Sequence, residues 1–150
     1  MFRVSTQAQT WVKSLLGQDP FKLSIDIYYI FCLTGLAAEE IKEIEGASHD
    51  ILDYFPTPYQ DHQRLIINFL LISEKNRLGI ANEDKDRIKK ELIEKFIDPN
   101  INSLTSSGRS RLNDYANAGH RILSGKMATP GNAAVFLEVW LNEMKEIEKK

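Results

Sequence analysis

Few side chains in this sequence stand at spacings that support chemistry. The best set of candidate metal ligands consists of histidines and aspartates on both sides of a short aromatic stretch: His49, Asp50, Asp53, Asp61 and His62. Imidazole and carboxylate groups are suitable ligands for several divalent metals. However, Pro56 and Pro58 separate the two halves of the set, so no single helix face can hold its members at a fixed spacing. We therefore expect surface polar residues here and no metal site.

No other cluster predicts catalysis. The sequence has no glycine-rich phosphate loop, no CxxC and no HExxH. Cys32 lies in the most apolar segment, where a thiol usually acts as a small hydrophobic group. His120 precedes Arg121, and we expect it on a helix surface, with a phosphate contact as the alternative. The sequence therefore predicts a protein that is not an enzyme and that needs no cofactor. An enzyme using the histidines and aspartates around the aromatic stretch is the least favoured reading.

The basic residues are stronger candidates, because they gather in two segments. The chain carries a net charge of −2, which excludes a global cationic field for nucleic acid. Yet residues 1–25 and 101–130 are both rich in bases, whereas residues 38–62 hold seven acids and one base. If the two basic segments meet in space, they form a face that can bind DNA phosphates; otherwise they are solvated surface charges. The candidate residues are Arg3, Lys13, Lys22, Arg109, Arg111, Arg121 and Lys126.

The elements that would position these residues are mostly helical. Residues 2–5 alternate between apolar and polar, as in a short half-buried strand, and a helix capped by Ser5 or Thr6 follows as far as Gly17. Residues 25–37 are almost entirely apolar, which favours a buried helix and leaves a buried strand as the alternative. The acidic stretch that follows predicts an exposed helix end that stops near Gly46.

The second half of the chain predicts four further helices. They cover residues 61–78, a segment capped by Asn82 and closed by Pro99, residues 110–123, and the stretch from Pro130 to the end. The helix between Asn82 and Pro99 should bury Ile88, Leu92, Ile93 and Phe96. The last should turn its apolar residues inward: Ala133, Phe136, Leu137, Trp140, Leu141, Met144 and Ile147. We therefore expect an all-α fold, one domain over residues 1–150 with about six helices and room for one short N-terminal strand.

Two features of this arrangement suggest contacts with other molecules. A short strand, a short helix and a longer apolar helix follow one another in ribbon-helix-helix proteins, where strands of two chains pair and outward side chains enter the DNA major groove. Arg3 and Ser5 would be the outward side chains here; we favour the alternative, a strand or arm that pairs with a partner and reads no sequence. The aromatic residues Tyr54, Phe55 and Tyr59 form either a docking patch or the cover of a core edge, and we expect the cover.

Several stretches resemble one known family. FRVSTQAQTWVKSLLG followed by YIFCLTGLA, then NRLGIANEDKDRI and NAGHRILSG, are similar to segments of the DNA sulfur modification protein DndE family. The resemblance implies a small helical subunit, without catalysis, that self-associates and works beside a sulfurtransferase and an ATPase in DNA phosphorothioation, a modification used in antiviral defence. It also implies that Arg3, Lys13 and Lys22 contact the DNA backbone. The helix from Pro130 extends beyond the resemblance.

Two hypotheses follow for the function. The first is an accessory subunit of a DNA modification or defence complex that contacts the DNA backbone through the basic residues. The alternative is a helical scaffold or interaction subunit with no nucleic-acid contact of its own. Under either hypothesis the partners include other subunits and further copies of the chain. No apolar run is long enough for a membrane span, and the single cysteine suits a reducing cytoplasm.

Overall fold

The computed structural model describes residues 1–52, 55–100 and 103–150. Its elements in chain order are β1 (Arg3–Ser5), α1 (Thr6–Leu15), α2 (Ser24–Ala38), β2 (Ser48–Asp50), the 3-10 helix η1 (Thr57–Tyr59), α3 (Gln60–Leu78), α4 (Lys85–Arg87), the π-helix η2 (Ile88–Ile93), α5 (Glu94–Phe96), β3 (Ile97–Asp98), β4 (Ser103–Leu104), α6 (Ser106–Ser124) and α7 (Ala133–Glu148). The elements α4, η2 and α5 follow one another without a break, so residues 85–96 form one helical segment. The expected mostly helical fold is therefore confirmed.

The fold is not purely helical, which corrects the all-α expectation. Strand β1 pairs antiparallel with β2, and β3 pairs antiparallel with β4, giving two small two-stranded sheets. Among the described residues, no helix is both long and apolar enough to cross a membrane.

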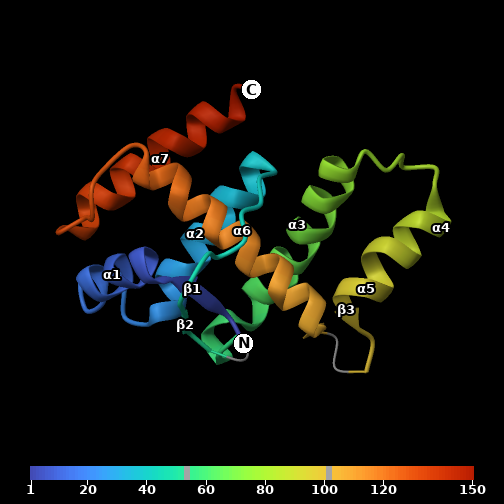
Figure 1. Ribbon diagram of the computed structural model, residues 1–150, viewed down its shortest axis with the longest axis horizontal. Helices are drawn as coiled ribbons and strands as arrows, with labels where there is room; N and C mark the ends of the chain where they lie inside the picture. Colours follow the sequence, from blue (N-terminus) through green and yellow to red (C-terminus); the bar gives the residue numbers. More distant parts are fainter. Residues whose placement is uncertain (53–54, 101–102) are drawn as a thin grey trace.

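The helices α2 and α6 form the centre of the molecule, where α6 crosses over α2 (Figure 1). Residues 25–37 are therefore helix, not strand. Two glycines allow the close approach: a Cβ added at Gly35 would lie 1.9 Å from the Tyr115 carbonyl oxygen, and one at Gly119 would lie 1.9 Å from that of Phe31. Any larger residue would push the two backbones apart. The nearly all-apolar sequence of α2 follows from this position, because neighbours cover it on most sides.

Helix α1 packs against this centre and holds the start of α7. The Ser5 hydroxyl caps α1 by accepting a hydrogen bond from the Ala8 amide. Trp11 and Phe21 both contact the ring of Phe136 edge-on, at centroid distances of 6.1 and 5.7 Å. These aromatic contacts anchor the first half of α7 to the N-terminal part of the chain.

The N-terminal strand pairs within its own chain. The register of β1 and β2 places Arg3 opposite Asp50 and Ser5 opposite Ser48. On its other side, the Arg3 amide donates to Oδ1 of Asn113 on α6. Both sides of this short strand are thus occupied, which does not fit the ribbon-helix-helix arrangement in which two chains pair these strands.

One helix boundary and two sets of inward-facing residues predicted from the sequence were wrong. Helix α2 ends at Ala38, because Glu39 adopts a left-handed conformation with φ 55°, so the acidic residues after it are not helical. In the segment 85–96 the π-helix changes the spacing of inward positions, so Leu92 and Phe96 are buried while Ile93 is exposed. In α7 only Ala133 and Phe136 of the predicted inner face are buried.

The exposed part of that predicted face has a simple cause. Helix α7 packs against the body mainly through its first half, and Leu141 keeps 51% of its surface exposed. An apolar stripe predicts burial, but it does not say whether this chain or another molecule provides the cover.

Candidate functional site

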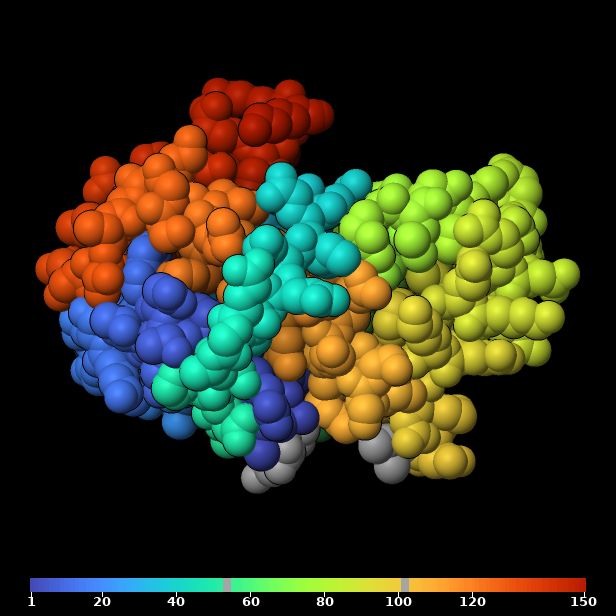
Figure 2. All heavy atoms as spheres, viewed as in Figure 1, coloured from blue at the N-terminus to red at the C-terminus, as the bar shows by residue number. Residues whose placement is uncertain are grey.

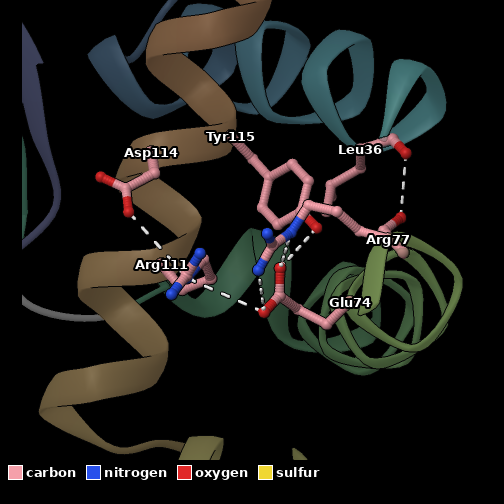
Figure 3. A network of polar contacts seen from close by, with 7 residues as sticks. Leu36, Glu74, Arg77, Arg111, Asp114 and Tyr115 are labelled. Atoms are coloured by element: carbon pink, nitrogen blue, oxygen red, sulfur yellow. Dashed lines mark hydrogen bonds and ion pairs between the residues drawn. The ribbon is translucent and has the colours of Figure 1, made fainter. Parts of the chain in front are cut away.

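The densest polar cluster surrounds Glu74, which is only 1% exposed (Figure 3). Arg77 donates from Nε to Oε1 at 2.9 Å and from Nη2 to Oε2 at 3.0 Å. The Tyr115 hydroxyl of α6 donates to the same Oε1 at 2.7 Å, and Nε of Arg111 lies 3.8 Å from Oε2. Nearby, the Ser73 hydroxyl donates to the Leu36 carbonyl. The cluster therefore joins α3 to both central helices.

The electrostatics of this cluster follow from burial and pairing. Desolvation raises the pKa of Glu74, but the hydrogen bonds from Arg77 and Tyr115 and the charge of Arg111 outweigh it, so the pKa lies below its ordinary value. Burial and the Glu74 carboxylate raise the pKa of Tyr115. Burial also raises the pKa of Asp114, although Arg111 partly opposes this. The cluster pairs a buried carboxylate with arginine and tyrosine partners, and it thereby stabilises the packing of α3 against α6.

The candidate metal ligands do not come together. His49 lies beside the Thr6 hydroxyl, 3.2 Å from Nε2, and Asp50 forms an ion pair with Arg3. His62 lies on α3 against the rings of Tyr29 and Tyr59. Asp53 lies outside the described residues. Within the described ranges, no group of three or more histidine, cysteine, aspartate or glutamate residues could hold a metal ion.

Four of the seven predicted DNA-contacting residues are engaged within the chain. Arg3 pairs with Asp50 at 3.1 Å, and Arg111 lies between Glu74 and Asp114. Arg109 lies in the first turn of α6, and Lys126 follows its last residue. Arg109 donates to the Leu104 carbonyl and to the Ser106 hydroxyl, and Lys126 lies 3.7 Å from Glu143. A phosphate would have to compete with these partners.

The other three, Lys13, Lys22 and Arg121, are exposed, and none forms an ion pair with a described residue. The seven residues come from β1, α1, α6 and the loops that follow α1 and α6. Arg109 and Arg121 alone are about 18 Å apart along α6, since an α-helix rises about 1.5 Å per residue.

The sequence analysis overlooked another basic segment, the helical stretch 85–96. It carries five exposed bases: Lys85, Arg87, Lys89, Lys90 and Lys95. Three exposed acids alternate with them, and two bases are paired: Arg87 with Glu91 at 2.7 Å and Lys89 with Glu94 at 4.0 Å. The segment lies beside α3 on the side of the molecule away from α1 (Figure 1). The bases are visible in the sequence, but acidic residues alternate with them, so the segment did not stand out as basic.

A second overlooked feature is apolar and lies on α2 and α3. On α3, Leu65 and Ile72 are 63% and 56% exposed, the two highest values for large apolar side chains among the described residues. With His62 and Phe69 they follow the 3- and 4-residue spacing of one helix face. On α2, Tyr29 lies 5.5 Å from the His62 ring, and Leu33 and Ala37 continue its half-exposed face. We call this set of seven residues the α2–α3 face: Tyr29, Leu33, Ala37, His62, Leu65, Phe69 and Ile72.

The aromatic stretch lies at one end of this face. Phe55 is buried against Phe2, with ring centroids 4.9 Å apart, which confirms it as the cover of a core edge. Tyr59 is half-buried, and its hydroxyl donates to Asp26. Tyr54 lies outside the described residues.

Two single residues complete the survey. Cys32 is fully buried, as expected, and burial raises the pKa of its thiol. His120 is not on a helix surface, which corrects that prediction: it is 4% exposed and lies edge-on to Trp11 and Phe31, with centroid distances of 4.8 and 5.3 Å. Neither ring nitrogen has a hydrogen-bond partner among the described residues. Burial, with a small contribution from Arg121, lowers the pKa of His120 to about 4, so the ring is neutral at pH 7.

Comparison with known protein families, with curated proteins and with solved structures finds no match to this chain. Functional inference therefore rests on its own residues and geometry.

Proposed function

We propose that the protein is a helical interaction subunit without catalytic activity, which binds an amphipathic helix of a partner protein on its α2–α3 face. The observation that carries this proposal is the exposure of Leu65 and Ile72 beside a row of aromatic side chains. Contiguous apolar surface of this kind is costly in water and commonly marks a binding site.

The geometry of the face suits a helical partner. Helices α2 and α3 run side by side in the same direction, since Tyr29 meets His62 near their starts and Asn76 bonds Glu39 near their ends. Two adjacent helices present parallel rows of side chains at 3- and 4-residue spacing, into which a third apolar stripe can pack. Hydrogen-bonded polar pairs lie at both ends of the α2–α3 face. Asp26 and Tyr59 form the pair at one end, and Glu39 and Asn76 form the pair at the other.

Photo-crosslinking tests this role. A photoreactive amino acid at Leu65 should crosslink a specific partner in the native host, whereas the same group at Lys90, on the exposed 85–96 segment, should not. The crosslinked partner, once purified, should bind the wild-type protein and lose about tenfold or more in affinity for Leu65→Glu/Ile72→Glu. A partner that binds both forms equally, or crosslinking that is the same at both positions, would overturn the proposal.

The DNA-contacting role, favoured by the resemblance to the DndE family, stays a prediction. The interaction role is preferred because four of the seven basic residues already have partners and the seven are spread over β1, α1, α6 and two loops. The two roles are compatible with one complex, in which this subunit would hold other subunits while those contact the DNA.

Self-association is part of the same proposal, through α7. This helix carries Ala134, Leu137, Leu141 and Met144 at the spacing of a coiled-coil seam, and of these Ala134 and Leu141 are exposed. Sedimentation analysis should show oligomers of the wild type that dissociate in Leu141→Glu and persist in Leu65→Glu. A monomeric wild type at micromolar concentration would remove this part of the proposal alone.

A further inference from the structure

A cavity of about 750 Å³ opens between four segments that are distant in sequence. They are the start of α1, the acidic stretch after α2, the last turns of α6 and the loop that leads to α7. Figure 2 shows residues 40–50, in teal, crossing the front of the molecule beside the blue N-terminal part of the chain and over the orange α6. The side chains used below are Trp11, Glu43, His120, Arg121 and Met127.

The walls of the cavity are held in place by cross-links between these segments. Nδ2 of Asn117 donates to the carbonyls of Lys42 and Glu43, and the Lys42 amide donates to the Asp114 carbonyl. These bonds fix the acidic stretch on α6.

Beyond the lining, where α1 meets the loop that leads to α7, the Ser14 hydroxyl donates to the Pro130 carbonyl. Gln18 donates to the Gly131 carbonyl and accepts from the Ala133 amide. The cavity is therefore pre-formed, which reduces the ordering cost of binding.

The charges in the lining are of both signs and are not all paired. Glu45 has Lys42 at 3.3 Å, but neither Glu43 nor Arg121 forms an ion pair with a described residue. A guanidinium favours a carboxylate, which it can bind through two parallel hydrogen bonds, and a carboxylate favours an ammonium group.

His120 adds a buried imidazole to the lining of the cavity. Its side chain lies in the cavity wall, is more than nine-tenths buried, and has two unpartnered ring nitrogens. A neutral imidazole offers one donor and one acceptor, and leaving both unused is costly in a folded protein. Trp11 and Met127 provide apolar surface beside it.

We propose that this cavity binds a small zwitterion of the amino-acid type, with its carboxylate on Arg121, its ammonium group on Glu43 and an apolar side group against Trp11. This site is independent of the α2–α3 face and of α7, so it adds a small-molecule ligand to a subunit otherwise proposed to bind proteins.

Tryptophan fluorescence provides the test, because only Trp11 and Trp140 are present. In a Trp140→Phe background, the Trp11 signal should change and saturate as L-leucine, L-methionine or L-phenylalanine is added to millimolar concentration. The methyl ester and the decarboxylated amine of the same compound should bind about tenfold more weakly or worse, because each lacks the charge that Arg121 recognises.

Matched variants complete the test. Arg121→Gln and Glu43→Gln should each weaken binding of the free amino acid by about tenfold, whereas Arg64→Gln on α3 and Glu138→Gln on α7, both exposed and outside the cavity, should not. The absence of a saturable change with all three amino acids, or equal binding of acid and ester, would overturn the proposal.

Discussion

At the scale of single residues, His120 shows how burial controls charge. The imidazole lies among aromatic rings with no hydrogen-bond partner in the described chain, and its pKa is lowered to about 4. A histidine between a glycine and an arginine gave no sign of this in the sequence. Burial depends on Trp11 and Phe31, which reach it from two other helices, and no local pattern reports such contacts.

The lowered pKa of His120 predicts a pH-dependent stability. The unfolded chain takes up this proton near pH 6.5 and the folded protein near pH 4, so the unfolded state binds more protons between these values. The free energy of unfolding should therefore be highest above pH 6.5 and fall by on the order of 3 kcal/mol as pH drops to 4. Urea unfolding across this range measures the slope. His120→Phe should flatten it, and an unchanged slope in that variant would show that other groups cause the effect.

Glu74 carries a second prediction, with its own pH window. Glu74→Gln leaves Arg77 and Arg111 without their carboxylate, and since both are partly exposed we expect a loss of about 2 kcal/mol at pH 7. Because the folded pKa is below the ordinary value of 4.5, the contribution is present above pH 4.5 and is lost as pH falls through the lower folded pKa. Urea unfolding of both proteins should thus converge in strong acid. Equal stability at pH 7 would contradict this account.

At the scale of elements, the crossing of α2 and α6 depends on two glycines. Adding a methyl group at Gly35 or Gly119 places it 1.9 Å from a backbone oxygen of the facing helix, which cannot move aside cheaply. Gly35→Ala and Gly119→Ala should each cost about 3 kcal/mol or more. Gly131→Ala is the matched control, because a Cβ there meets no atom within 4 Å, and it should change stability by less than about 0.5 kcal/mol. Denaturant midpoints distinguish these outcomes; a neutral Gly119→Ala would mean that the helices can separate.

The sequence was a good guide to which helices exist and a poorer guide to their ends. The cap at Ser5 was readable because it acts within a few residues, whereas α7 begins at Ala133 with Asn132 as its cap and not at Pro130 as predicted. The end of α2 at Ala38 was not readable, because nothing in an acidic run forbids another turn. The π-helix at 88–93 was also unreadable, since Leu92 and Phe96 are four residues apart and an ordinary α-helix also places that spacing on one face.

At the scale of the whole molecule, the charge distribution leads to a prediction about DNA binding. The net charge is −2, and most predicted contacts are paired or separated. We therefore expect the isolated protein to show no binding of labelled duplex DNA, intact or nicked, at about 0.15 M salt, where exposed charges are screened beyond about 8 Å. Fluorescence anisotropy across a salt series measures this.

A steep weakening of binding with salt would instead indicate phosphate contacts. Comparing Arg121→Glu with Lys89→Glu/Lys90→Glu would then show whether α6 or the 85–96 segment carries them. Proximity in sequence places basic residues on one element, but it does not decide which side of the molecule that element presents.

The hydrogen bonds between the first residues and α6 have a consequence for the synthesis of the chain. Asn113 accepts hydrogen bonds from the Arg3 amide and the Tyr28 hydroxyl and donates one to the Met1 carbonyl. The bonds to Arg3 and Met1 join residues that are 110 and 112 positions apart in the sequence. On the ribosome, the first residues and the nearly all-apolar α2 emerge long before α6 exists. The nascent chain must wait in that state, and for most of its translation α2 is a natural target for a chaperone.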